Sequence, residues 1–485
     1  MRRSLLLMSA AALALTPATA QQGARQLNPR DVAEAQRQHA EMVQELGGAE
    51  TGPRAAYVES IGRRVGAFSG VANPGQALRF TMLNSAVENA LSVPGGYVYV
   101  TRQLMSIMDD EAQLAFALGH EVGHIAANHA QAREEYAQRN NIYGALGQVL
   151  GQIFGARGIG NVISQRSALR TLSFSRDQEY QSDTLGMRYM IAAGYDPAGA
   201  AGVLGALSRA TALQTRVQGR SNRQAPEWAS THPLSENRRQ RAFAAAQASG
   251  RLGTGIRNRD GFLEQLEGLY VDDDPAQGVI DGPTFLHPDL RIGFSVPPGY
   301  RMSNGTSALT VSGSAGKAQF GGGRFSGPLE NYIGRVFQEL TQGQIPLAIP
   351  PAQRTTINGL PTAFTTARMR TRSGVIDITV IAYQWDPQRV YHFIMLTPGG
   401  AAAGAFTPMV NSLRKISPAE AAAIRPRIID VVTVQPGDTS QSLAGRMAYR
   451  DFRLERFLSL NGLAPNAPPR PGQRVKLIVY GQRRA

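Results

Sequence analysis

Residues 109–130, DDEAQLAFALGHEVGHIAANHA, place the strongest constraint on this chain, because one predicted helix there carries three of its seven histidines. Asp109 or Asp110 is suited to cap the start of this helix. The segments on either side of the histidines are apolar and predict burial. A buried polar side chain without a partner is costly, so buried histidines beside a buried glutamate need a reason. The helix is therefore expected to be buried.

His120 and His124 are four residues apart and lie on one face of this helix, ~40° apart around its axis. Two neutral imidazoles on one helix form half of a tetrahedral zinc site. Glu121, next to the first histidine, is positioned to hold a water rather than the metal, in the H-E-x-x-H arrangement. The alternative is an exposed helix with ordinary polar residues. His129 falls on a different face and is interpreted as a packing or supporting residue.

A third metal ligand must come from elsewhere, and SFSRDQEYQSDTLGMRYM (173–190) offers one on a second helix. Glu179 and Asp183 lie on one face of that helix, four residues apart. Glu179 is expected to bind zinc, and Asp183 to hold a ligand histidine through its second ring nitrogen. Gly186 would let the two helices approach closely.

These segments resemble the zinc metallopeptidases that include HtpX, BepA and the CAAX prenyl proteases. HEVGH and SRDQEYQSDTLG resemble the H-E-x-x-H and S-R-x-x-E-x-x-A-D-x-x-G motifs of that family, except that Ser182 replaces the usual alanine. ENALSVPGG resembles N-A-F-x-x-P-G-G, with Leu91 in place of phenylalanine. STHPLSENR resembles T-H-P-x-x-x-x-R. The motifs occur in family order over roughly residues 45–245.

The resemblance implies a role for each matching residue. Zinc, one per chain, would be held by His120, His124 and Glu179 and would acidify a water from which Glu121 takes a proton. His232, with Arg238 nearby, would stabilise the oxyanion, or His232 would approach the metal and act as a gate. Arg238, like Asp183, is expected to support the site from behind the ligands. The edge strand at Ser92, Val93 and Pro94 would bind an extended polypeptide through main-chain hydrogen bonds.

The rest of the chain divides into further segments, so the fold class expected is α+β multidomain. Residues 28–252 predict a mainly helical zincin-type peptidase domain with a small β-sheet. Residues 284–417, with short β-rich runs and one helix, predict an α+β domain of unknown role. The acidic VDDDPAQG between them, with Asp272 to Asp274, is interpreted as a solvated turn.

Residues 429–480 form a predicted βααβ unit that resembles a LysM domain. Its matching residues are Pro436, Gly437, Asp438, Thr439, Asn461, Pro471, Gly472 and Gln473. The resemblance implies binding to peptidoglycan, and the alternative is a simple docking domain.

Composition and the first residues indicate where such a protein works. Residues 1–20 read as a cleaved signal peptide, and the chain has no cysteine, which excludes disulfides and thiolate ligands. The formal charge of +14 is spread along the chain without a dense basic block, which argues against nucleic acid and favours cell-wall polymer or anionic lipid. The alternative is that the charge serves solubility and implies no partner. A membrane-facing flap at Ile142–Ile163 is a further alternative.

The function expected is that of a periplasmic zinc endopeptidase, associated with the cell wall or outer membrane, that cleaves misfolded or misassembled envelope proteins. Two alternatives remain open. One is a peptidase acting on peptidoglycan peptides. The other is a gated chaperone or scaffold bound to the cell wall.

Overall fold

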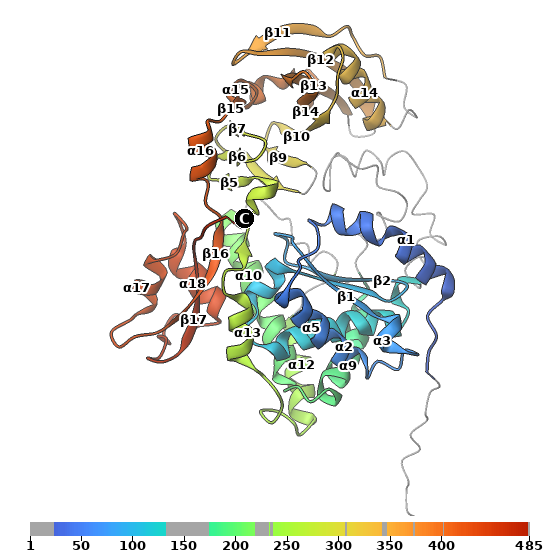
Figure 1. Ribbon diagram of the computed structural model, residues 1–485, viewed down its shortest axis with the longest axis vertical. Coiled ribbons are helices and arrows are strands. Elements are labelled where there is room, and N and C mark those ends of the chain that lie inside the picture. The colour runs from blue at the N-terminus through green and yellow to red at the C-terminus, as the bar shows by residue number, and fades with distance from the viewer. Residues whose placement is uncertain are drawn as a thin grey trace, which may run out of the picture.

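The computed structural model describes residues 24–131, 174–218, 232, 236–305, 308–341, 347–371, 374–400 and 402–483 (Figure 1). The expected signal peptide at 1–20 and the flap at Ile142–Ile163 lie outside these residues. Within the described ranges, none of the helices combines the length and the apolar character needed to cross a membrane.

The N-terminal half of the chain is mostly helical and surrounds a small sheet. The sheet has the strand order β1-β3-β2, with β1 parallel and β2 antiparallel to β3. Its strands are β1 (Arg79–Leu83), β2 (Ala90–Val93) and β3 (Tyr97–Thr101). The helices are α1 (Pro29–Glu45), α2 (Pro53–Gly66), α3 (Pro74–Ala77), α4 (Arg102–Ile107), α5 (Glu111–Ala126), α9 (Arg176–Ala192), α10 (Ala198–Gln218), α12 (Glu236–Ala248) and α13 (Arg259–Leu266).

Helix α5 is the buried centre of this half. Asp110 caps its first turn by accepting a hydrogen bond from the Gln113 backbone N–H, and the residues that follow are almost all buried. Helix α9 packs directly against it. A Cβ on Gly186 of α9 would lie 2.8 Å from the His120 backbone nitrogen, so only glycine permits this approach.

The middle of the chain is an α+β region built on a seven-stranded antiparallel sheet, in the order β11-β12-β13-β14-β10-β9-β8. One face of this sheet packs on α14 (Leu329–Thr341), and the other packs on a four-stranded sheet of order β15-β7-β6-β5 and on α15 (Thr407–Ser412). The large sheet comprises β8 (Arg301–Asn304), β9 (Leu309–Gly313), β10 (Gly316–Arg324), β11 (Gln353–Ile357), β12 (Leu360–Thr371), β13 (Gly374–Asp386) and β14 (Arg389–Pro398). The smaller one comprises β5 (Val279–Asp281), β6 (Thr284–His287), β7 (Ile292–Ser295) and β15 (Arg414–Lys415), and 3-10 turns lie at Pro275–Gln277 and Ala402–Phe406.

The C-terminal unit has the expected βααβ order and follows a short helix, α16 (Pro418–Ala423). It consists of β16 (Arg427–Thr433), α17 (Ser440–Gly445), α18 (Arg453–Asn461) and β17 (Arg474–Tyr480). A short strand from outside the unit, β4 (Tyr270–Val271), pairs with β16 and extends the sheet to three strands. The α+β class is thus confirmed.

The C-terminal unit is docked on the helical half and shares one continuous hydrophobic core with it. Lys476 of β17 is fully buried, and its ammonium group donates hydrogen bonds to the backbone oxygens of Ser106 (3.1 Å) and Met108 (2.5 Å). The same group lies 3.2 Å from Asp109 Oδ1. These three residues lead into α5, so the C-terminal unit is bound to the segment that starts the central helix.

The interpretation of Asp272–Asp274 as a solvated turn is wrong. The Asp272 carboxylate accepts hydrogen bonds from Arg427 and Tyr449 of the C-terminal unit, and Asp273 accepts one from the Ile280 backbone N–H. Asp274 is buried and accepts a hydrogen bond from Asn84 of the helical half. The turn joins all three parts of the chain, and no pattern in the local sequence reveals those long-range partners.

We expect Gly186→Ala to destabilise the protein by about 1–3 kcal/mol, because the added methyl group meets the backbone of α5. Gly334→Ala is the matched control, since Gly334 lies inside α14 with open space around its Cα. That control should be neutral or stabilising by about 0.5–1 kcal/mol. Thermal unfolding followed by circular dichroism measures both, and equal effects would contradict the proposed contact.

Candidate metal centre

The face of α5 that meets α9 carries His120 and His124, and the neighbouring Glu121 is directed at Ser92 of β2. Each of the three is at most 3% exposed. The Nε2 atoms of the two histidines lie 3.1 Å apart. Helix geometry brings these two rings together, as their four-residue spacing predicts.

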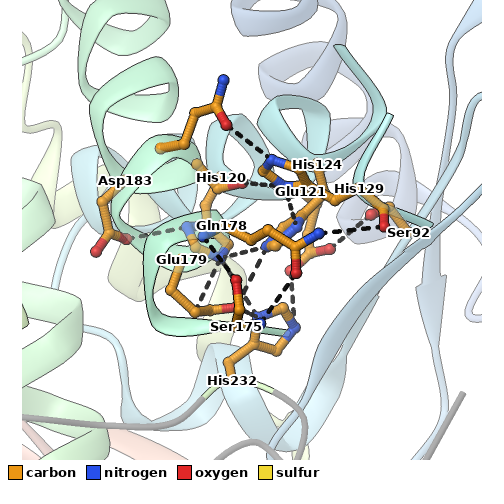
Figure 2. Close-up of polar contacts among 12 residues, drawn as sticks. Ser92, His120, Glu121, His124, His129, Ser175, Gln178, Glu179, Asp183 and His232 are labelled. Atoms are coloured by element: carbon orange, nitrogen blue, oxygen red, sulfur yellow. Dashed lines mark hydrogen bonds and ion pairs between the residues drawn. The ribbon is translucent and has the colours of Figure 1, made fainter. Parts of the chain in front are cut away.

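Helix α9 brings two carboxylates to the same place. A capping box between Ser175 and Gln178 fixes its start. One turn later, the Glu179 oxygens lie 3.5 Å from His124 Nε2 and 3.7 Å from His120 Nε2. Asp183 Oδ1 lies 3.0 Å from the other nitrogen of His120, Nδ1, so it holds that ring in place. Figure 2 shows both carboxylates reaching His120 from α9.

His232 completes the cluster from a distant part of the chain. Its Nδ1 lies 2.9 Å from Glu179 Oε1 and 3.4 Å from His120 Nε2, and its Nε2 lies 3.4 Å from Glu121 Oε1. The ligand atoms of His120, His124, Glu179 and His232 all lie within 4.8 Å of one another. The structure therefore puts His232 among the potential metal ligands.

Arg238 of α12 is buried and directed at the carboxylates. It donates two hydrogen bonds to Asp183, at 2.8 and 2.7 Å, and its Nη1 lies 2.5 Å from Glu179 Oε2. A guanidinium held in this way positions both carboxylates. These contacts place Arg238 behind the carboxylates, in the supporting position expected for it beside Asp183.

The donor set fits a zinc ion. Zinc–nitrogen bonds of about 2.0–2.1 Å in a tetrahedral site put two ligand atoms roughly 3.3 Å apart, close to the separation of the two Nε2 atoms. Burial lowers the pKa of His124 well below its ordinary value, which keeps the ring neutral as a ligand requires. Burial acts to raise the pKa of Glu179, but His232, His124 and His120 hold it well below its usual range, so Glu179 is a carboxylate.

Two further side chains orient His124. His129 Nδ1 lies 2.9 Å from His124 Nδ1, and its Nε2 lies 3.0 Å from Gln181 Oε1, which places His129 beside the cluster and behind a ligand. Phe174 stacks on the His124 ring at a centroid distance of 3.8 Å. Sequence analysis missed Phe174, because a single aromatic residue before a helix carries no signal of its own.

The expected substrate strand lies beside the cluster. β2 is at the edge of the small sheet, and a pocket next to it is lined by Ser92, Val93 and Pro94 together with His124 and Phe174. The Ser92 hydroxyl donates a hydrogen bond to Glu121 Oε2 at 2.8 Å. The sequence placed Ser92 on the strand but gave no sign of this contact.

We expect Asp183→Asn to lower the affinity for zinc by about 10- to 100-fold, because the carboxylate that orients His120 is lost. A competition titration with a chromophoric chelator measures this. Asp177→Asn on the exposed face of the same helix is the control and should bind zinc like the wild type. Equal affinities for all three proteins would exclude the assigned role of Asp183.

Comparisons with known proteins agree with this geometry. Residues 53–245 match peptidase family M48, and residues 432–477 match the LysM domain. The chain is similar to the beta-barrel assembly-enhancing protease of Escherichia coli O157:H7, with 30% identity over 192 residues that cover 38% of this chain and 37% of that protein. It is also similar to the mitochondrial metalloendopeptidase OMA1 of Arabidopsis thaliana, with 32% identity over 117 residues that cover 24% of this chain and 23% of that protein.

In both comparisons the match spans well under half of the relative's length. The two matched segments coincide with the helical half that holds the His120 cluster and with the βααβ unit. The chain therefore contains a peptidase family M48 domain and, towards its C-terminus, a LysM domain.

Proposed function

We propose that the protein is a zinc-dependent endopeptidase of the bacterial periplasm that cleaves misfolded or misassembled envelope proteins. The observation that carries this proposal is the buried convergence of His120, His124 and Glu179, with Glu121 beside it. The match to peptidase family M48 and to two relatives named as proteases supports it.

The division of labour follows from the contacts. His120, His124 and Glu179 hold zinc, which when bound supplies a Lewis acid that polarises a peptide carbonyl and acidifies a water molecule. Glu121 is the general base, since its carboxylate contacts Ser92 and His232 and is not part of the ligand cluster. It takes a proton from the attacking water and delivers it to the leaving amine.

His232 acts as a gate in this proposal. A catalytic zinc site keeps one position open beside three protein ligands. The Nδ1 of His232 lies among the atoms of these three ligands, 2.9 Å from Glu179 Oε1, so it would compete for the open position of a bound zinc. In this proposal His232 has to move away before a substrate can be cleaved.

The substrate is a polypeptide bound along β2. An extended chain can add to this edge strand through main-chain hydrogen bonds, which depend little on side-chain identity. Tolerance of this kind suits an enzyme that acts on misfolded chains. The periplasmic location rests on the signal-like residues 1–20 and on the similarity to the Escherichia coli protease.

We expect Glu121→Gln to retain one zinc per chain and to cleave casein about 10²- to 10⁴-fold more slowly than the wild type, because only the general base is lost. Metal analysis and a casein assay on the same samples measure both. Removal of zinc with a chelator should abolish cleavage by the wild type, and added zinc should restore it. Cleavage by Glu121→Gln at the wild-type rate would contradict the assigned role of Glu121.

His232→Ala serves as the test of the gate. It should keep zinc, since three ligands remain, and should cleave casein faster than the wild type. Slower cleavage would instead assign His232 to the transition state. If neither protein cleaves casein while both bind zinc, the gated scaffold becomes the better explanation.

The LysM domain is proposed to bind peptidoglycan. Its Pro436–Gly437 turn and most of the loop before β17 are exposed, so a glycan can reach them. The positive charge of the chain favours an anionic cell wall.

We expect the full chain to sediment with purified sacculi, and soluble N-acetylglucosamine oligomers to release it. The same incubation tests the alternative substrate. Muropeptides released by the wild type but not by Glu121→Gln would make peptidoglycan peptides the substrate, whereas their absence supports protein substrates. Absence of sedimentation would leave the LysM domain with the docking role alone.

A further inference from the structure

The strand β2 turns its two faces to different parts of the molecule. Leu91 and Val93 pack into the small cluster formed with α1. Ala90 belongs to the core around α5, and Ser92, two residues on, shares that side of the strand. Because side chains alternate between the two faces of a strand, the Ser92 side chain points at the helix that carries His120 and Glu121.

Ser92 contacts one oxygen of Glu121, and His232 lies against the other. Its hydroxyl donates to Glu121 Oε2 at 2.8 Å, and Figure 2 shows the two side chains side by side. Glu121 is fully buried, and its second oxygen, Oε1, has no hydrogen-bond partner within the described part of the chain. Oε1 faces His232 Nε2 across 3.4 Å.

A carboxylate next to a cluster of metal ligands can adopt more than one orientation. It can rotate towards the ligands, or it can stay apart and act as a base. A hydrogen bond to one of its oxygens restricts rotation of the group and leaves the other oxygen as the better proton acceptor. Ser92 supplies this bond from outside the helix, across a sequence separation of 29 residues.

We propose that Ser92 is a positioning residue that holds Glu121 Oε2 and thereby presents Oε1 as the base. The inference rests on the proposed peptidase function and deepens it. Ser92 occupies a position that the resemblance to N-A-F-x-x-P-G-G leaves open to any residue, so the role comes from this chain's own contacts.

Ser92 also belongs to the strand proposed to bind the substrate. Its backbone and its hydroxyl would contribute separately, the first to substrate binding and the second to the position of Glu121. The substrate would bond to the backbone N–H and C=O of the strand, which a side-chain substitution leaves in place. The hydroxyl acts on the base alone. Loss of the hydroxyl should therefore lower kcat and leave KM unchanged.

The test compares zinc-loaded Ser92→Ala and Ser92→Thr with the wild type, each also carrying His232→Ala if the wild type is closed. We expect Ser92→Ala to reduce kcat roughly 10- to 100-fold, as for the loss of a hydrogen bond to a charged group, with unchanged KM and zinc content. Ser92→Thr keeps a hydroxyl and should recover most of the activity. Ser60→Ala, which removes an exposed serine hydroxyl on α2, is the control and should match the wild type.

A crystal structure of zinc-loaded Ser92→Ala gives a readout that does not depend on turnover. The Glu121 carboxylate should be rotated or disordered there and ordered in the wild type. Wild-type kcat in Ser92→Ala, or a Glu121 carboxylate that stays in place, would overturn the proposal. Failure of the proposed function looks different: the wild type and His232→Ala would both be inactive, and the crystal structures would still decide whether Ser92 positions Glu121.

Discussion

The close contact between α5 and α9 is the constraint on which the candidate metal centre depends. Imidazole and carboxylate ligands of one zinc ion have to converge within about 3.3 Å. A glutamate on one helix reaches histidines on another only if the backbones approach closely. Gly186, with Gly119 and Gly123 on the facing helix, removes the side chains that would keep them apart. The Asp110 cap and the Ser175 capping box then fix where each helix starts, which sets the register between the two faces.

The candidate site also buries several negatively charged carboxylates. Glu179 and Asp183 contact one guanidinium, that of Arg238, and Glu121 is a third carboxylate buried at the same site. Isolated buried charges are costly, so this excess of negative charge favours a dication between the ligands. Burial acts to lower the pKa of His232, but the carboxylates of Glu179 and Glu121 raise it above its ordinary value. A protonated His232 can thus offset part of the negative charge when no metal is bound.

Much of this arrangement was predictable because its signals are local. The spacing of His120 and His124, and of Glu179 and Asp183, translates directly into side chains on one helix face, and the structure brings these pairs together. The α+β class and the βααβ order followed from similar short-range patterns. The contacts of Ser92, Phe174 and Lys476 could not be predicted from the sequence. Their partners lie far along the chain, and a serine, a phenylalanine or a lysine is compatible with many environments. The acidic turn at Asp272–Asp274 was misread for the same reason.

The buried Lys476 has a consequence for how far the enzyme can reach. A binding module on a flexible linker would let a protease sweep a volume around its anchor. Here the LysM domain shares a core with the peptidase half, and Lys476 is bonded to the backbone that leads into α5. Anything held by the LysM domain is therefore held at one distance and one angle from His120 and His124. A cell-wall glycan bound by the LysM domain would thus fix the position of the metal site, and polypeptide substrates would have to diffuse to that position.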